Sequence, residues 1–296
     1  MKSGDRLLKV LWLFTEERPV LEVEEISKSL QISISTAYRY VSQLCEAGFL
    51  APMGPVGYGL GPAIIELDRR IRMADPLVQS AAPVLRRLLG DLDPAATILL
   101  CRLYRDQVMC IAQRQGRESP GRENLGRGVP DRESLGGLSY ERGRPMPMLH
   151  GAPSKAILAH LPSRAAERLW EAEAEESKPG DWKSFRAQLL RIRKAGVVVS
   201  HAEIDPGVVG VAACVFDPQG RPIGSVCAVL PESGVSQPVV ARVSTLVRAS
   251  ADEISATLFE REVERQATAG SAKPVKSKSA RPQGLAALGP PRGAVH

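Results

Sequence analysis

The sequence lacks any hydrophobic run that approaches the roughly 20 apolar residues needed to cross a bilayer. Its first apolar stretch is interrupted by Glu16, Glu17 and Arg18, so no secretory signal peptide is expected there. These two absences argue against membrane insertion and against export. We therefore expect a cytoplasmic protein that has no membrane partner.

Residues typical of catalysis and metal binding are also scarce. The chain has 4 histidines, and no nucleophile, base and orienting group occur at a spacing typical of an active site. The 5 cysteines are an odd number, and no pair has metal-ligand spacing. We therefore expect no enzyme, no metal and no cofactor. We interpret the cysteines as small buried apolar residues and His150 as a hydrogen-bonding loop residue.

Positive charge is concentrated near the C-terminus. The formal net charge of the chain is +6, and five cations without an acid occur after Gln266. They are Lys273, Lys276, Lys278, Arg281 and Arg292. Because the surrounding residues are rich in Pro, Gly, Ala and Ser, we expect a disordered basic tail over residues 264–296. Of two roles for it, a solubilising appendage is favoured over a weak, salt-dependent DNA tether.

The most informative segment spans residues 22–60, where the pattern predicts a helix, a turn, a second helix and a Gly-rich hairpin. A first amphipathic helix over residues 5–17 precedes them. Ser33 is placed to N-cap the second helix of the pair, and Gly48 to end it. The apolar residues expected to face the core on that helix are Ala37, Tyr40, Val41 and Leu44. This order is typical of a winged helix-turn-helix.

The other side of that helix is free of core-forming residues. No acid occurs between Glu25 and Glu46, so this side suits phosphates and base edges. A helix fits the DNA major groove, and a hairpin wing can lie along the adjacent backbone. The candidate DNA-binding residues are Ser33, Ser35, Thr36, Tyr38, Arg39, Ser42 and, on the hairpin, Tyr58. Since residues 1–60 are nearly neutral overall, a small helical bundle with a hairpin stays open as an alternative.

Helical and strand patterns alternate through the rest of the chain. A linker helix follows Gly61-Pro62, and its apolar stripe fits either an intramolecular core or a dimer seam. Helices are expected over 76–89, 153–161, 163–175 with Ser163 as N-cap, 182–195 and 237–262, and strands over 97–104, 107–113, 197–199, 208–216 and 223–230. Residues 114–144 read as a long solvated loop. This alternation indicates an α+β domain with one antiparallel sheet.

Several ordered motifs resemble the IclR family of bacterial transcription regulators. Residues 30–41 (LQISISTAYRYV) resemble the family's recognition segment, and residues 48–50 and 58–62 its wing and exit. Residues 144–159 resemble the loop and helix that close its effector pocket, and residues 193–217 its central strand pair. The resemblance covers residues 5–262.

The resemblance implies a winged helix-turn-helix domain over residues 1–61, a linker helix over 62–75 and a GAF-like effector-binding domain with an antiparallel sheet over 76–263. It also implies dimers, often paired into tetramers, on double-stranded operator DNA, and a small organic effector. Transferred by position, the effector-binding candidates are Gly151, Ala152, Ser154, Ser200, Gly210, Cys214, Cys227 and Val229, with Met146 and Met148 as a flexible wall. Loop amides near them are expected to attract a carboxylate.

The chain departs from the family pattern at three places. Ile34 stands where the family often has a basic or polar residue, and the wing tip has neither Arg nor Lys. Both departures indicate fewer phosphate contacts. Cys227 and Val229 occupy a strand on which the family places more polar groups, which favours an aromatic or branched acid as effector. Two other classes stay open: an architectural DNA-binding protein without a ligand, and a small-molecule enzyme with an accessory DNA-binding domain.

Overall fold

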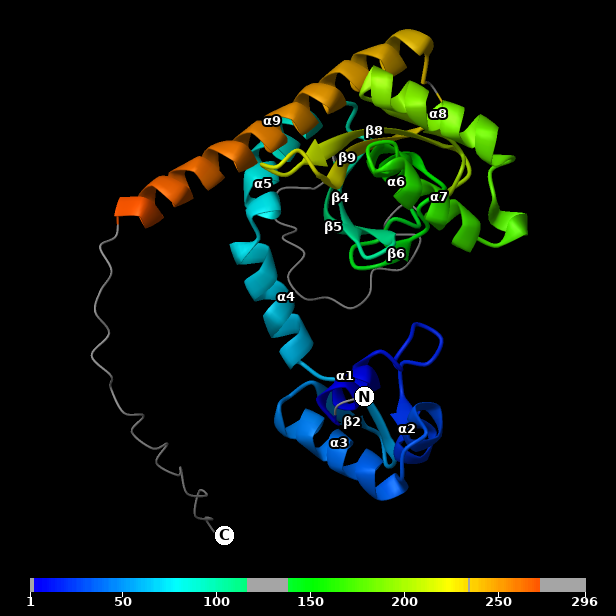
Figure 1. Cartoon of the computed structure of the whole chain (residues 1–296), viewed down its shortest axis with the longest axis vertical. Coiled ribbons are helices and arrows are strands. Elements are labelled where there is room, and N and C mark those ends of the chain that lie inside the picture. The colour runs from blue at the N-terminus through cyan, green and yellow to red at the C-terminus, as the bar shows by residue number, and fades with distance from the viewer. Residues whose placement is uncertain (1–2, 116–137, 234, 272–296) are drawn as a thin grey trace.

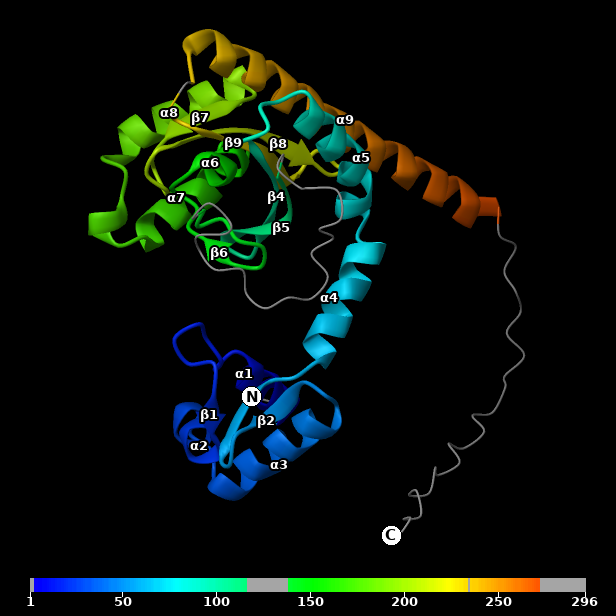
Figure 2. The ribbon, with the colours of Figure 1, turned by 180° about the vertical axis from the view of Figure 1, so that it is seen from behind.

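The computed structural model describes residues 3–115, 138–233 and 235–271. An N-terminal helical domain with a small sheet is joined by one helix, α4 (Ala63–Ala74), to a larger domain built on a six-stranded sheet (Figure 1). Figure 2 shows the same order from behind. Among the described residues, no helix has the length and apolar content that a membrane crossing requires.

The N-terminal domain packs three helices on a three-stranded sheet. Its elements are α1 (Ser3–Leu11), β1 (Leu21–Glu22), α2 (Val23–Leu30), α3 (Ile34–Glu46), β2 (Leu50–Met53) and β3 (Gly57–Leu60), with sheet order β1-β3-β2. The helix expected over residues 5–17 is wrong in its second half. The chain turns back after Leu11, and Thr15 and Arg18 exchange backbone hydrogen bonds of 3.2 Å, so Phe14 reaches the core from a loop.

Local hydrogen bonds fix both ends of α3. Gln31 has a left-handed backbone (φ 52°) that closes the turn after α2, and the hydroxyl of Ser33 accepts a bond from the amide of Thr36 at 3.3 Å. At the other end Gly48 (φ 74°) follows the helix, and the amide of Phe49 donates to the carbonyl of Leu44. The expected N-cap and end of the helix are confirmed. Residues next to α3 in the sequence therefore determine where this helix begins and ends.

A buried carboxylate joins the linker helix to the next helix, α5 (Pro76–Gly90). Asp75 ends α4 and N-caps α5, and its Oδ1 accepts a bond from the amide of Leu77 at 2.9 Å. The guanidinium of Arg102 binds both carboxylate oxygens, at 2.6 and 2.7 Å. Because Arg102 lies on the central sheet, this contact ties the end of the linker to the large domain.

The large domain has a fully antiparallel sheet of order β6-β5-β4-β9-β8-β7. Its strands are β4 (Thr97–Tyr104), β5 (Gln107–Gln115), β6 (Pro145–Met146), β7 (Val198–His201), β8 (Val208–Phe216) and β9 (Pro222–Pro231). Its helices after α5 are α6 (Ala152–Leu158), α7 (Ser163–Ala172), the 3-10 turn η1 (Glu175–Ser177), α8 (Trp182–Ala195) and α9 (Gln237–Ser271).

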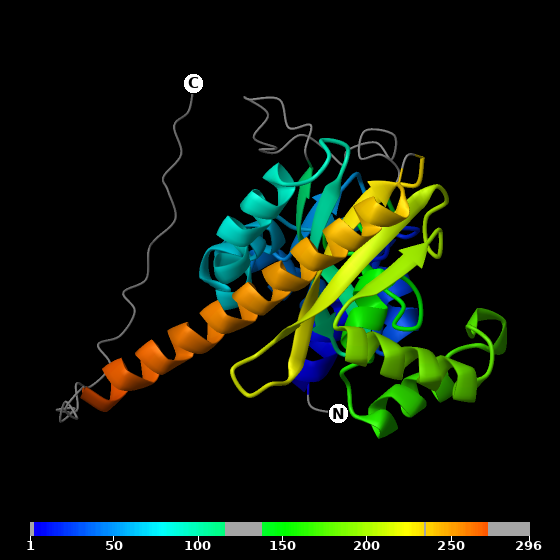
Figure 3. The same ribbon diagram turned by 90° about the horizontal axis from the view of Figure 1, so that it is seen from above.

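Helices cover both faces of this sheet. Helices α5 and α9 pack on one face, and α9 runs diagonally across it, while α6, α7 and α8 lie on the other (Figure 3). Strand residues alternate between the two cores: Ile98 and Leu100 face α5 and α9, whereas Leu99 and Cys101 face α6. The α+β architecture is therefore the one expected from the sequence.

Several expected boundaries differ from the structure. Ser163 is the first residue of α7 and not its N-cap, because Pro162 takes that position. Helix α9 continues past Glu262 to Ser271, and residues 272–296, most of the expected tail, lie outside the described residues. The expected solvated loop over 114–144 is wrong at its described end, because Leu138 and Tyr140 are buried in the core; residues 116–137 lie outside the description.

Candidate functional site

The outward side of α3 carries most of the predicted DNA-binding residues. Tyr38 is 53% exposed, and Arg39 and Ser42 are exposed beside it, while the core-facing residues of the helix are buried as expected. The guanidinium of Arg39 lies 5.7 Å from the ring centre of Tyr40, and the hydroxyl of Ser42 donates to Glu46 at 3.3 Å. This side is therefore polar, solvent-facing and built on a helix held at both ends.

The hydroxyl residues at the start of α3 form one cluster. The Oγ of Ser33 lies 3.1 Å from the Oγ of Ser35 and 2.8 Å from the Oγ1 of Thr36. Tyr58 behaves differently from the other candidates, because it lies on β3 and packs half-buried against the domain's core. The structure thus places five predicted residues on α3 and Ser33 at its N-cap, with Tyr58 apart from them.

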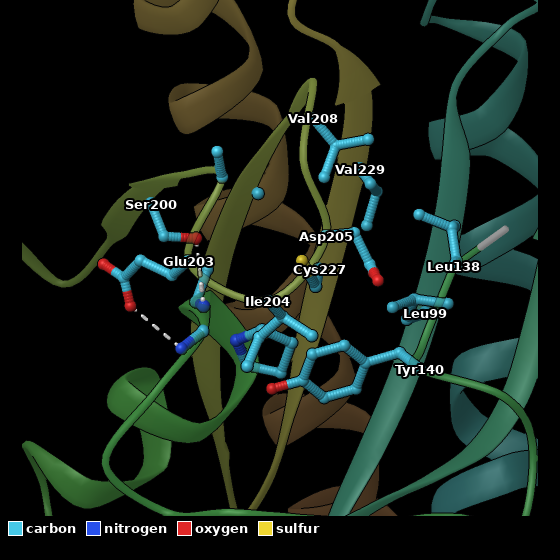
Figure 4. A pocket seen from close by; sticks show the side chains of 15 residues that line it. Leu99, Leu138, Tyr140, Ser200, Glu203, Ile204, Asp205, Val208, Cys227 and Val229 are labelled. Carbon is cyan, nitrogen blue, oxygen red and sulfur yellow. Dashed lines mark hydrogen bonds between the residues drawn. The ribbon is translucent and has the colours of Figure 1, made fainter. Parts of the chain in front are cut away.

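A pocket of about 380 Å³, counting the solvent at its mouth, lies on the α6 side of the large sheet. Its lining comes from β4, β7, β8 and β9, the start of α6, the segment around Tyr140 and the β7–β8 loop (Figure 4). The lining residues are Leu99, Leu138, Tyr140, Gly151, Ala152, Pro153, Ser200, Ala202, Glu203, Ile204, Asp205, Val208, Gly210, Cys227 and Val229. A concave lining that is mostly apolar and carries a few polar groups is typical of a small-molecule site.

Six of the ten predicted effector residues line this pocket: Gly151, Ala152, Ser200, Gly210, Cys227 and Val229. The other four lie outside it. Ser154 is fully buried behind Tyr140, Met146 and Met148 are buried in the neighbouring core, and Cys214 lies further along β8, opposite Ser225. Burial raises the pKa of the Cys227 thiol, so this side chain offers the pocket a neutral group.

Sequence reasoning missed the pocket wall that faces these residues. Tyr140 is 5% exposed, and its hydroxyl lies 3.2 Å from the Oγ of Ser154, while burial raises the pKa of its phenol. Ile204 projects toward the same space from the β7–β8 loop (Figure 4). Both residues come from segments without periodicity, so no sequence signal pointed to them. Gly151 is required here, because a Cβ at this position would lie 2.6 Å from the Tyr140 hydroxyl.

The loop amides expected to receive a carboxylate are bonded to the protein's own side chains. Glu203 accepts a bond from the amide of Gly151 at 3.0 Å, and the hydroxyl of Ser200 accepts one from Ala152 at 3.1 Å (Figure 4). The Nζ of Lys155, whose side chain is 4% exposed, lies 2.7 Å from the Glu203 carboxylate. A carboxylate is thus present at this end of the pocket, and it belongs to the chain itself.

His150 has a structural contact. Its Nε2 lies 2.5 Å from the carbonyl oxygen of Ser177, outside the pocket lining, as expected of a loop residue. Across the described ranges, no three His, Cys, Asp or Glu side chains gather closely enough to hold a metal ion. The 5 cysteines are all free thiols, and 4 of them are buried.

The segment that contributes Tyr140 also reaches the linker helix. Arg142 binds Asp68 of α4 with two nitrogens, one of them at 3.1 Å, and its Nε donates to the carbonyl of Ile111 at 3.0 Å. On the pocket side, the carboxylate of Asp205 accepts bonds from the amide and hydroxyl of Ser139, at 2.9 and 2.6 Å. A short run of chain therefore connects the pocket lining with α4.

Comparison with known proteins agrees with this architecture. Residues 3–52 match the family described as the IclR helix-turn-helix domain, and residues 137–256 match the family described as bacterial transcriptional regulator IclR C-terminal. No curated protein matches the chain.

Solved structures with the same fold include three bacterial proteins. A putative IclR regulator from a Silicibacter species has 19% identity and a TM-score of 0.68, over 87% of this chain and 96% of that one. An Alicyclobacillus acidocaldarius regulator has 23% identity and a TM-score of 0.66, over 86% and 98%. An IclR homologue from Microbacterium hydrocarbonoxydans, complexed with 4-hydroxybenzoate, has 22% identity and a TM-score of 0.67, over 88% and 100%.

Proposed function

The chain belongs to the IclR family of bacterial transcriptional regulators, and from this premise we propose that it is a cytoplasmic regulator whose affinity for one operator sequence changes when a small organic molecule binds. The outward side of α3 carries this proposal. Four residues of α3 pack in the core of the N-terminal domain, while Tyr38, Arg39 and Ser42 face solvent. A recognition helix presents such a solvent-facing side to the major groove.

The pocket lining favours an effector with a largely apolar body. Leu99, Ile204, Val208 and Val229 surround the space, and the Tyr140 hydroxyl lies at its edge. The ligand of the Microbacterium relative, 4-hydroxybenzoate, has such a body. An acidic effector has to compete with the Glu203 carboxylate for the amide of Gly151. We therefore propose a small aromatic or branched molecule as effector. An acid group on it binds well only where the Glu203 carboxylate releases the amide of Gly151.

In this proposal, the Arg142–Asp68 contact transmits the structural effect of ligand binding to the DNA-binding domain. Ligand contacts with Tyr140 shift the segment that carries Arg142, and Arg142 holds α4. Both partners are about one-third exposed, so the contact is modest in energy. A modest contact suffices, because coupling between ligand sites is typically about 1–3 kcal/mol.

Exposed apolar residues support assembly into dimers, which pair into tetramers. Leu8 on α1 is 59% exposed, and Trp12, directly after that helix, is 64% exposed; on α4, Ile65 is 72% and Ile71 59% exposed. Clusters of large exposed apolar side chains mark protein contacts more often than free surface. Light scattering tests this: wild type should run as a dimer or tetramer, and Ile65→Asp/Ile71→Asp should lower the mass.

The function is tested by recovering bound genomic fragments from cells and measuring their affinity for the purified protein. One or a few fragments should be enriched, and binding should fall by orders of magnitude on unrelated DNA of equal length. A thermal-shift screen of aromatic and branched acids and their uncharged analogues should find ligands that raise Tm and alter operator affinity. Enrichment without any ligand hit would favour an architectural protein; turnover of a ligand would favour an enzyme.

A further inference from the structure

Ile34, the first residue of α3, is an apolar side chain that the fold does not use. It is 43% exposed, and it is not among the residues that pack on the core of the N-terminal domain. Tyr38, one turn later, is 53% exposed on the same side of the helix. A β-branched apolar residue adds little to helix formation, whereas burial against a partner would let this side chain contribute binding free energy.

The surroundings of Ile34 limit what that partner can be. Ser33, Ser35 and Thr36 share hydrogen bonds of 3.1 and 2.8 Å, so their hydroxyls are held together around the start of the helix. Arg39 adds a positive charge to the solvent-exposed part of α3, and no acid lies on α3 before Glu46. An apolar group framed by hydroxyls and a cation fits a nucleic-acid surface better than a purely apolar one.

In a helix-turn-helix, the N-terminal residues of the second helix contact base edges in the major groove. Base edges there carry hydrogen-bond donors and acceptors, and in unmodified DNA their apolar group is the C5 methyl of thymine. We propose that Ile34 is a specificity-determining residue, which packs on a thymine methyl at one position of each operator half-site. This inference rests on the proposed function, and it adds which base this residue selects.

A second copy of the chain is a less suitable partner for Ile34. Apolar side chains on α4 and directly after α1 are more exposed: Trp12 is 64%, Ile65 72% and Met73 61% exposed. Helix α1 packs on the core side of α3, and α4 leads from this domain toward the large sheet (Figure 1). A dimer formed through them leaves Ile34 free to meet DNA.

The test replaces each thymine of the recovered operator by deoxyuridine, which lacks the C5 methyl alone. Wild type should lose about fourfold in affinity at one thymine per half-site, equivalent to the about 0.8 kcal/mol of one buried methyl group. Ile34→Ala should bind the thymine operator more weakly and show less than a 1.5-fold response at that position. Leu190→Ala, which truncates an apolar residue that is 55% exposed on α8 of the large domain, serves as the matched control and should respond like wild type.

Three results would overturn the inference. The first is equal responses to deoxyuridine in wild type and Ile34→Ala at every thymine. The second is a uniform loss of affinity in Ile34→Ala with a smaller mass in light scattering, which assigns Ile34 to a protein contact. The third is a lower Tm in Ile34→Ala, which assigns it to the fold. Failure of wild type to bind any recovered fragment would overturn the proposed function as well, whereas the first three results leave that function intact.

Discussion

Replacement of Asp75 by alanine should destabilise the large domain by about 3 kcal/mol. The carboxylate has an 8% exposed side chain, caps α5 through Leu77, and binds Arg102 at 2.6 and 2.7 Å. Loss of an N-cap costs about 1 kcal/mol. Breaking a fully buried ion pair from one side costs roughly 3–5 kcal/mol, which we reduce to about 2 kcal/mol because Arg102 is 34% exposed.

Urea denaturation followed by circular dichroism measures this change, and a fall in Tm of roughly 6–12 °C should accompany it. Asp75→Asn keeps a cap acceptor and should lose about half as much. The control is Asp106→Ala, which breaks the 3.4 Å pair with Arg168, where both side chains are 66% exposed; its cost should stay below about 0.5 kcal/mol. The reasoning is refuted if Asp75→Ala costs under about 1 kcal/mol, or if a double-mutant cycle with Arg102→Ala gives no coupling.

Four further predictions follow from the geometry. Ser33→Ala should lower the stability of the N-terminal domain by about 1 kcal/mol, and an unshifted melting curve would argue against the cap. Glu203→Gln keeps a hydrogen-bond acceptor for the amide of Gly151 and removes the negative charge. Affinity for benzoate-type anions should therefore rise about tenfold, while affinity for uncharged analogues stays level. Equal changes in the two affinities, measured by calorimetry, would contradict this prediction. Arg142→Ala, which breaks the contact with Asp68, should retain the thermal shift given by a ligand. It should reduce the ligand's effect on operator affinity at least threefold, by about 0.7 kcal/mol. An unchanged ligand effect would show that the Arg142–Asp68 contact does not couple the two sites. Hydrogen bonds from Ser184 hold the pKa of Asp181 below its usual 3.8. The stabilisation that the Asp181 carboxylate gives to α8 as N-cap is therefore fully present above pH 3.8 and is lost as pH falls through the lowered pKa. Asp181→Ala should lower Tm at neutral pH, and the decrease should become smaller in acid.

Helices whose ends are determined by neighbouring residues could be predicted from the sequence. Helix α8 begins and ends where its periodicity and Gly196 (φ 70°) place it, and α3 has the expected Ser33 cap. In both helices the residues that decide the boundary are neighbours in sequence. Helix α1 shows the limit of this reasoning, because Phe14 keeps a helical spacing and yet packs from a loop.

The pocket was only partly predictable, because contacts between distant segments build it. Ser139 is held by Asp205, 66 residues later, and the amide of Ala152 by Ser200, 48 residues later. Neither contact leaves a periodic signal in its own segment, so the wall around Tyr140 could not be inferred. Of the six effector candidates from the family resemblance that line the pocket, four lie on strands: Ser200, Gly210, Cys227 and Val229.

The most direct test of the account is the affinity of Arg39→Ala for the recovered operator, measured by fluorescence anisotropy beside that of Arg168→Ala. Arg39 lies on the outward side of α3, and Arg168 is an exposed cation on α7 of the other domain. Loss of a bidentate base contact should weaken binding by about 5-fold to 150-fold, equivalent to about 1–3 kcal/mol, while Arg168→Ala stays within about twofold of wild type. Equal affinities for the two variants would contradict the assignment of α3 as the DNA-reading helix.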